Sequence, residues 1–229
     1  MKLAIITARG GSKRIPRKNI REFCGKPILA YSIEAALSSG VFDEVMISTE
    51  DDEIAEIAVR YGASFPFRRS AQAADDHATT MDVLADVIAM YEKERQGVRP
   101  ESICCIYPTA PFVTAEKLRR ANNLLEESGA DAVIPVVRFS YPPQRCFVTD
   151  GTFLRYKWPE YERSRSQDLE PYYHDAGQFY FIRTEAMLTG QTLVPAKTAP
   201  LILDETEVQD IDTLDDWIIA EMKYRAMKS

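Results

Sequence analysis

The chain has 229 residues, of which 45% are hydrophobic, so it is long enough for one α/β domain with a substantial core. Its 28 basic and 35 acidic residues give a net charge of −7 at pH 7, which argues against nucleic acid or an anionic membrane as the main partner. The apolar run after Lys2 ends at Arg9, too early for a signal peptide, and nothing approaches the ~18 apolar residues of a membrane span. We therefore expect a soluble, cytoplasmic protein.

The cysteines support the same location. Cys24, Cys104, Cys105 and Cys146 form no Cys-x-x-Cys pair. Cys104 and Cys105 lie in the apolar run "SICCIY", where neighbours on a strand point to opposite faces. We expect reduced, buried thiols, which are typical of the cytoplasm.

Strand-like and helix-like segments alternate through the first 137 residues. The expected strands are 2–8, 44–49, 102–107 and 130–137. The expected helices are 27–40, 51–62, 79–95 and 114–129, with Gly40 as a stop signal and Thr114 as a cap. This order predicts an α/β fold: a mostly parallel sheet, helices on both faces, and a ligand at the carboxyl ends of the strands.

The alternation stops between Arg138 and Tyr173, where Pro, Tyr and Arg are frequent and Asp150-Gly151 predicts a hairpin turn. A hairpin this rich in aromatic side chains is too apolar to stand alone in water. We expect one domain, 1–229, containing an inserted hairpin at 138–173 that packs on a second subunit. The aromatic residues behind this expectation are Phe147, Phe153 and Trp158.

Two further elements are expected after the insertion. Residues 177–183 predict a strand, and residues 210–227 predict a capped helix. We expect Trp217, Ile218 and Met222 on the buried side of that helix.

The segment "TARGGSKRIPRKN", residues 7–19, concentrates positive charge directly after the first strand. Gly10 and Gly11 allow backbone N–H groups to turn toward an anion, which favours a phosphate site over a solvated loop. The side chains expected to contribute are Arg9, Ser12, Lys13 and Lys18, whereas Arg14 and Arg17 are expected in solvent or at the rim of the cavity. The spacing matches neither a Walker A loop nor G-x-G-x-x-G, which disfavours P-loop NTPases and nicotinamide-dependent enzymes.

Asp210 and Asp212 point to one side of a short extended run and are candidate ligands for Mg²⁺. The alternative is that Asp212 caps the helix that begins near Thr213. A second acidic cluster, Glu50 to Glu53, fits a helix N-terminus better than a metal site.

Several motifs in one order carry a resemblance that spans nearly the whole chain. They are "ARGGSKRIPRKNI", "GKPILAYSIEAA", "STEDDEIAEIA", "YPTAPF" and "QDID". The chain resembles the nonulosonic acid (acylneuraminate) cytidylyltransferases, which activate acidic sugars with CTP. The resemblance implies a Rossmann-like nucleotide-diphospho-sugar transferase fold, Mg²⁺ as cofactor and a homodimer. In the implied reaction, the anomeric hydroxyl of the sugar attacks the α-phosphate of CTP and releases pyrophosphate.

The resemblance also implies nucleotide-site residues. The CTP-binding positions are Ala8, Arg9, Gly10, Gly11, Ser12, Lys13, Lys18, Arg69, Ala78, Thr79 and Thr80. Arg9, Lys13 and Asp212 are the expected catalytic residues, with Lys13 stabilising the charge that develops at the α-phosphate. Arg69 is expected to contact the cytosine. His77 is expected near the cap of the next helix rather than as a base.

The sugar-binding positions implied are Tyr107, Thr109, Arg165, Gln167, His174, Gln178 and Tyr180. Sialic-acid-activating relatives tend to carry Arg at the position of His174 and Gln at that of Tyr107. This departure favours pseudaminic acid over N-acetylneuraminic acid. Legionaminic, sialic and deoxyoctulosonic acids remain alternative substrates, and a nucleotide-binding regulator without catalysis is an alternative function.

Overall fold

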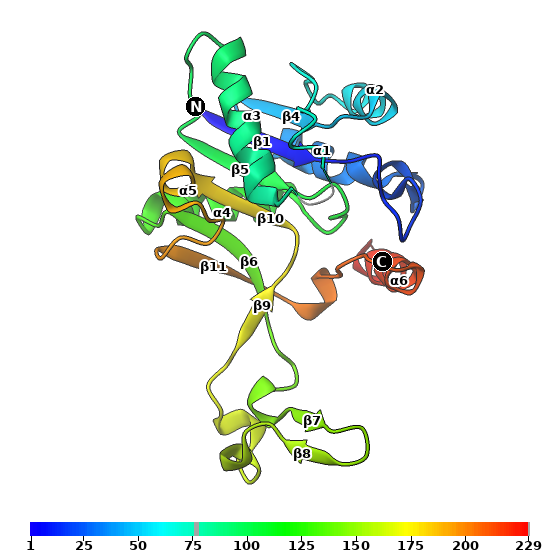
Figure 1. The fold of residues 1–229 in the computed structure, drawn as a ribbon, viewed down its shortest axis with the longest axis vertical. Coiled ribbons are helices and arrows are strands. Elements are labelled where there is room, and N and C mark those ends of the chain that lie inside the picture. Colours follow the sequence, from blue (N-terminus) through cyan, green and yellow to red (C-terminus); the bar gives the residue numbers. More distant parts are fainter. Residues whose placement is uncertain (76–77, 229) are drawn as a thin grey trace.

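The computed structural model describes residues 1–75 and 78–228 and contains a seven-stranded sheet flanked by helices (Figure 1). The strands of this sheet are β1 (Lys2–Thr7), β4 (Glu44–Ser48), β5 (Ser102–Ile106), β6 (Ala132–Arg138), β9 (Tyr173–Asp175), β10 (Phe179–Arg183) and β11 (Thr198–Leu203). The helices are α1 (Ile28–Ser39), α2 (Asp52–Arg60), α3 (Thr80–Glu94), α4 (Ala115–Glu127), α5 (Thr184–Gly190) and α6 (Leu214–Lys228). The elements expected from the sequence are confirmed, with small shifts at their ends.

The sheet has the order β11-β6-β10-β5-β1-β4, with β9 beside β6. β1 runs parallel to both β4 and β5, and β11 runs parallel to β6. β10 is antiparallel to its neighbours β5 and β6. The prediction of a mostly parallel sheet is therefore confirmed, and the carboxyl ends of β1, β4 and β5 lie at one edge.

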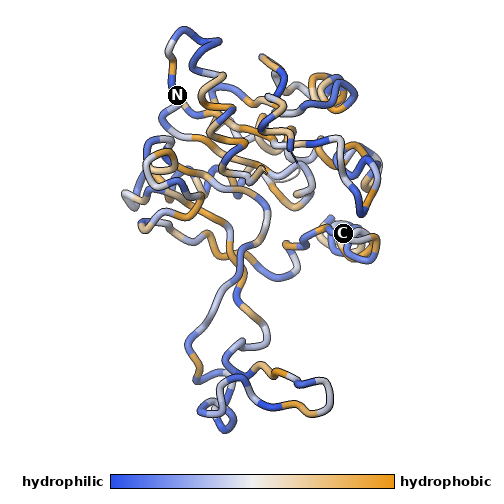
Figure 2. Tube along the Cα trace, viewed as in Figure 1, coloured by the Kyte–Doolittle hydropathy of each residue, from blue (hydrophilic) through white to orange (hydrophobic). Residues whose placement is uncertain are grey.

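Apolar side chains form a cluster on each face of the sheet, and Figure 2 shows the hydrophobic segments concentrated along its strands. α1, α2 and α4 cover one face, while α3 and α5 cover the other. Cys104 belongs to the first cluster and Cys105 to the second, as the alternation of a strand requires. Both thiols are buried, whereas Cys146 is exposed, contrary to expectation. No helix within the described ranges is long and apolar enough to cross a membrane.

α6 packs on a third cluster that includes Phe23 of the short strand β2 (Glu22–Phe23) and Ile28 and Tyr31 of α1. β2 pairs with β3 (Lys26–Pro27). The rings of Trp217 and Tyr224 lie 5.5 and 5.6 Å from that of Phe23. The expected buried face is wrong for Ile218 and Met222, which are 57% and 66% exposed. Trp217 and Tyr224 are two turns apart, so the stripe that faces the protein excludes the two aliphatic residues.

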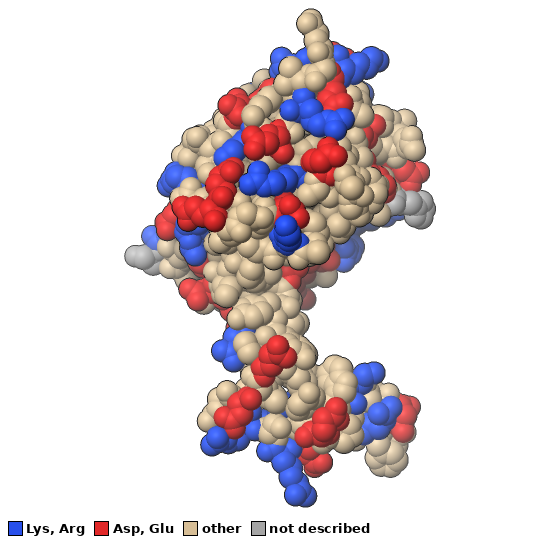
Figure 3. All heavy atoms as spheres, turned by 90° about the vertical axis from the view of Figure 1, so that its left-hand side faces the viewer, with Lys and Arg blue, Asp and Glu red and all other residues tan. Residues whose placement is uncertain are grey.

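Between β6 and β9 the chain leaves the sheet as an inserted segment, residues 139–172, joined to the body by a narrow neck (Figures 1 and 3). Its strands β7 (Phe147–Thr149) and β8 (Leu154–Tyr156) pair across Asp150-Gly151, which confirms the predicted hairpin turn. Short 3-10 helices accompany them: η2 (Pro143–Arg145), η3 (Pro159–Tyr161) and η4 (Ser166–Asp168). Phe153 is 75% exposed and Leu154 is 70% exposed, so the segment leaves apolar surface uncovered.

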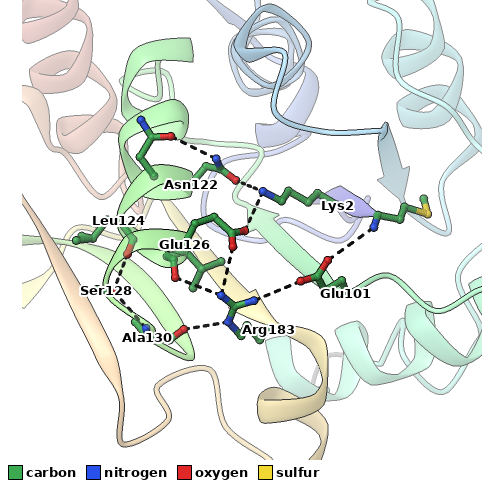
Figure 4. A network of polar contacts seen from close by, with 11 residues as sticks. Lys2, Glu101, Asn122, Leu124, Glu126, Ser128, Ala130 and Arg183 are labelled. Carbon is green, nitrogen blue, oxygen red and sulfur yellow. Dashed lines mark hydrogen bonds and ion pairs between the residues drawn. The ribbon is translucent and has the colours of Figure 1, made fainter.

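A network of ion pairs joins several elements at the amino end of β1 (Figure 4). Lys2 lies 2.9 Å from Glu126 of α4. Arg183, at the end of β10, lies 3.4 Å from Glu126 and 3.5 Å from Glu101, and its Nε donates to the Ala130 carbonyl at 3.2 Å. Lys2 and Arg183 thus each have a carboxylate partner, and the ion pairs join β1, β10 and α4 at this edge of the sheet.

Candidate functional site

A cavity of about 730 Å³ opens at the other edge, beside the carboxyl ends of β1, β4 and β5. Among the residues that the structure describes, five basic and two acidic side chains line it. The predicted nucleotide-site residues among its walls are Arg9, Ser12, Lys13, Lys18, Arg69, Ala78 and Thr80; Tyr107, Thr109 and Asp212 line it too. The structure thus brings residues from across the sequence to one cation-rich site.

The basic loop, residues 7–19, is held in place by groups at the start of α2. The Gly10 N–H donates to Glu50 Oε1 at 2.7 Å, and the Asn19 amide donates to the Arg9 carbonyl at 2.8 Å. A Cβ on Gly10 would lie 2.4 Å from Asp51 Oδ2, so this position requires glycine. Ala8, Gly10, Gly11 and Thr79 are outside the cavity wall, and their contacts with CTP stay predictions.

Arg17 has a structural role that was not expected. Its guanidinium donates to both carboxylate oxygens of Asp51 and to Glu53, instead of lying in solvent. The hydrogen bond from Arg17 lowers the pKa of Asp51, against the effect of burial. Asp51 also caps α2 by accepting from Ile54 N, as the acidic start of that helix predicts. The loop is therefore tied to the helix on one side and faces the cavity on the other.

Arg69 is fixed at the end of β4 and is only 6% exposed. Its Nε donates to Ser48 Oγ at 3.0 Å, its Nη2 donates to the Ser48 carbonyl, and Nη1 lies 3.7 Å from Glu50 Oε2. Burial lowers the pKa of Arg69, and the charge of Glu50 opposes that effect. A planar cation with a fixed orientation therefore faces the cavity, as base recognition requires.

Lys18 and Arg14 meet Asp212 at the opposite wall. Lys18 Nζ donates to the Ile211 carbonyl at 2.6 Å and lies 3.7 Å from Asp212 Oδ1, and Arg14 lies 2.8 Å from the same oxygen. Burial lowers the pKa of Lys18, whereas the charge of Asp212 raises it. Asp210 is exposed and outside the cavity wall.

The alternative role of Asp212 as a helix cap is wrong. Thr213 and Asp216 form the cap: Asp216 N donates to Thr213 Oγ1 at 3.2 Å, and Thr213 N donates to Asp216 Oδ2 at 2.8 Å. The Asp212 carboxylate is thus directed to the cavity. Within the described ranges no three His, Cys, Asp or Glu side chains gather as a metal site. Asp212 fits Mg²⁺ as a partial ligand, because Mg²⁺ commonly takes one or two carboxylates together with phosphate oxygens.

Tyr107 and Thr109 follow β5 and form the remaining wall. The Tyr107 hydroxyl lies 3.4 Å from Thr80 Oγ1, and its ring meets that of Tyr180 edge-on at 5.7 Å. Burial raises the pKa of Tyr107. Tyr180 in turn donates to Asp175, so it supports Tyr107 from behind rather than lining the cavity.

The other predicted sugar contacts do not reach the cavity of the same chain. Arg165, in the inserted segment, is 2.7 Å from Asp168. The ring of His174 lies 4.9 Å from that of Phe139, at the neck of the segment. The remaining two are Gln167, in η4, and Gln178, which is 2% exposed. Their roles toward the sugar stay predictions.

Asn19, Asp75 and Arg14 line the cavity but were not among the predicted site residues. Asn19 is the last residue of the basic motif, so its position in that motif could have predicted a place in the cavity wall. Asp75 lies in "AADD", which carries no comparable pattern. Thr79 caps α3 through a capping box with Asp82, and His77 lies outside the described residues.

The fold and the cavity together define an α/β enzyme that binds a phosphorylated nucleotide where parallel strands end. The family model described as cytidylyltransferase matches residues 3–192, and the chain belongs to that family.

Curated relatives match over almost the whole chain. A pseudaminic acid cytidylyltransferase of Campylobacter jejuni is 41% identical, covering 97% of this chain and 96% of the relative. A CMP-N,N'-diacetyllegionaminic acid synthase of Legionella pneumophila is 36% identical, covering 96% and 94%. A solved CMP:2-keto-3-deoxy-manno-octonic acid synthetase complexed with CTP superposes with a TM-score of 0.70 at 15% identity, covering 99% and 98%. The last similarity confirms the predicted fold class.

Proposed function

We propose that this cytidylyltransferase transfers CMP from CTP to the anomeric hydroxyl of pseudaminic acid and releases pyrophosphate. The observation that carries the proposal is the excess of basic side chains, five against two acidic ones among the described residues, in one cavity at the carboxyl ends of the strands. The full-length similarity to a pseudaminic acid cytidylyltransferase supports the choice of sugar.

Catalysis of phosphoryl-type transfer depends mainly on positioning and charge neutralisation. Arg9, Lys13 and Lys18 would bind the triphosphate. Lys13 would stabilise the charge that develops on the α-phosphate and the departing pyrophosphate. Arg69, which is fixed by Ser48 and Glu50, would read the cytosine. These residues come from two segments, the loop 7–19 and the stretch between α2 and α3, so the fold itself would align the nucleotide.

Asp212, with Asp210, would hold the Mg²⁺. When bound, the ion would neutralise phosphate charge and make the anomeric hydroxyl more acidic. The chain's own contribution is the orientation of the carboxylate, which lies 2.8 Å from Arg14 and 3.7 Å from Lys18. Those cations would hold the carboxylate in place beside the phosphates.

A pyrophosphate-release assay tests the function. The purified chain is incubated with CTP, Mg²⁺ and, separately, pseudaminic, legionaminic, N-acetylneuraminic and deoxyoctulosonic acids. Release with pseudaminic acid well above the others is expected. Preference for another sugar would overturn the substrate, and CTP binding without release from any sugar would indicate a regulator.

We also propose that the chain is a homodimer in which the inserted segment packs on a second copy. Phe153 and Leu154 are 75% and 70% exposed, which is more apolar surface than a free hairpin tolerates. Such packing would bring Arg165 and Gln167 to the partner's sugar site. The variant Phe153→Asp/Leu154→Asp should sediment as a monomer, whereas Val59→Asp, at a 51% exposed apolar position on α2, should not.

We also propose that the reaction takes place in the cytoplasm, where reduced thiols persist. Cys104 and Cys105 are free and buried, in agreement with that setting. Recovery of the protein and its activity in a membrane or periplasmic fraction would contradict this location.

A further inference from the structure

The segment 204–212 connects β11 to α6 and carries both predicted metal ligands. Basic side chains from other elements hold its backbone. Lys18 Nζ donates to the Ile211 carbonyl at 2.6 Å, and Lys223 Nζ donates to the Val208 carbonyl at 2.7 Å. The placement of the segment therefore depends on cations that belong to the rest of the fold.

Lys117 of α4 is an unusual member of this set, because it is only 4% exposed. Its Nζ donates to the Phe112 carbonyl at 3.0 Å and lies 3.4 Å from Glu207 Oε1. Burial lowers the pKa of Lys117, and the charge of Glu207 opposes that effect. A buried ammonium is costly to the fold, and an apolar residue of similar size is often as stable. Stability alone therefore gives no reason for a lysine here.

The two partners of the lysine belong to two segments that each contribute side chains to the cavity wall. Phe112 ends the loop that carries Tyr107 and Thr109, while Glu207 lies in the segment 204–212. A second bridge runs in parallel: the Gln178 side chain donates to the Glu207 carbonyl at 2.8 Å, and its backbone carbonyl accepts from Tyr107 N at 3.0 Å. The wall assigned to the sugar and the wall assigned to the metal are thus joined behind the cavity.

We propose that Lys117 is a positioning residue that fixes the loop 107–112 relative to the segment carrying Asp212. The inference rests on the proposed function, in which the sugar hydroxyl must align with the α-phosphate. Lys117 does not line the cavity, so it acts through Phe112 and Glu207. A displacement of about 1 Å between the two walls would cost roughly 100-fold in rate.

Hydrogen exchange tests the link without turnover. The amide of Val113 donates to Ala110, and that of Glu207 donates to Asp204, so each reports on one wall. In Lys117→Met, exchange at both amides should rise together. Lys223→Met is the matched control, because it also removes a lysine contact to segment 204–212 and leaves the loop 107–112 alone. In this control only the Glu207 amide should respond. An unchanged Val113 amide in Lys117→Met would overturn the link.

Kinetics test the consequence. With CTP, Mg²⁺ and the sugar that the wild type accepts, Lys117→Met should lower kcat by roughly 10- to 100-fold per folded molecule and raise the half-saturating Mg²⁺ concentration. The KM for CTP should stay within about 2-fold, since the base and triphosphate walls are untouched. Lys223→Met should keep kcat within about 3-fold. An unchanged kcat in Lys117→Met, or an equal loss in both variants, would contradict the positioning role.

Glu207→Ala carries the test if Lys117→Met fails to fold, because Glu207 is 34% exposed and its removal leaves no cavity in the core. It should reproduce the joint rise in exchange and lower kcat by roughly 3- to 10-fold. Wild-type exchange at both amides would overturn the proposal. An inactive wild type would refute the proposed function alone, since the exchange experiment still decides whether Lys117 joins the walls.

Discussion

Two polar regions lie at opposite edges of the same sheet and differ in their balance of charge. At the amino end of β1, Lys2 pairs with Glu126, and Arg183 pairs with both Glu126 and Glu101 (Figure 4). At the carboxyl end, five basic and two acidic side chains of the described residues line the cavity. We call the first the balanced region, because each of these cations has a carboxylate partner in the fold, whereas the excess of basic side chains in the second favours an anionic ligand.

The difference separates stability from function. Charges that find partners within the fold contribute to unfolding free energy, and charges gathered in excess around a cavity indicate a ligand. The outer surface follows neither pattern: Figure 3 shows both signs interspersed over one face of the body. The cavity is therefore a local feature of an acidic protein, in agreement with a small anionic substrate.

The contrast between the two regions is tested most directly by removing one cation from each and measuring kcat and stability. Lys13→Ala should lower kcat by roughly 10²- to 10³-fold, about 3–4 kcal/mol of transition-state stabilisation, because it removes charge at the reacting phosphate. Its unfolding free energy should change little. Lys2→Ala is the matched control, with wild-type kcat per folded molecule and lower stability. Initial rates and urea unfolding of both variants check this; equal kcat values would remove the distinction.

A second pair compares neighbouring residues at the start of α6. Asp212→Asn should lower kcat roughly 100-fold and weaken the response to Mg²⁺, because an amide is a poorer ligand than a carboxylate. The helix should stay intact, since Thr213 and Asp216 form its cap. Thr213→Ala should keep the wild-type kcat, but it removes the cap of α6 and should lower the unfolding free energy by about 1 kcal/mol. Unchanged turnover of Asp212→Asn across a Mg²⁺ titration would refute the metal assignment.

The sequence predicted the cavity's cation-rich loop because charge, glycine and position coincide in one short motif. Arg9, Lys13 and Lys18 all line the cavity, at the strand ends where the β-α order places a ligand. Arg17 lies in the same motif yet pairs with Asp51, and no local pattern distinguishes it from its neighbours. Its partner is 34 residues away, so only the fold reveals the pair.

The missed elements have physical reasons as well. β11 contains Pro200 and follows a Gly- and Pro-containing stretch, which weakens a strand pattern although an edge strand tolerates proline. The buried face of α6 was misassigned because its apolar residues surround the helix: Ile218 and Met222 are as hydrophobic as the residues that pack. The contacts of two predicted sugar residues could not be predicted either: Arg165 pairs with Asp168 inside the inserted segment, and His174 of β9 packs on Phe139, which is distant in the sequence.

The balanced region can be tested directly through Arg183. Its Nε donates to the Ala130 carbonyl, and its Nη2 lies 3.4 Å from Glu126. Arg183→Met should keep the stem of the side chain and lose these contacts, at a cost of about 1–3 kcal/mol of unfolding free energy. kcat per folded molecule should equal that of the wild type. Urea unfolding with parallel rate measurements checks both statements, and a selective loss of kcat would show that this edge is coupled to the cavity.

The smallest expected effect comes from a change at Asp51. Its ion pair with Arg17 is structural and lies beside the loop 7–19. Hydrogen bonding from Arg17 lowers its pKa from the ordinary value of 3.8. A carboxyl with a lower pKa in the folded state stabilises the fold above its unfolded pKa, and this stabilisation disappears as pH falls through the folded pKa. Asp51→Asn keeps the size and the capping oxygen but loses the charge.

The wild type should therefore exceed Asp51→Asn by about 1 kcal/mol of unfolding free energy at pH 6–7. The difference should shrink as the pH falls from about 4 toward 2. Urea unfolding of both proteins between pH 2.5 and 7 measures this difference. If the difference in unfolding free energy between the two proteins stays constant with pH, Arg17 holds the loop by packing and neutral hydrogen bonds rather than by charge. The cavity's cations would then be supported by packing alone.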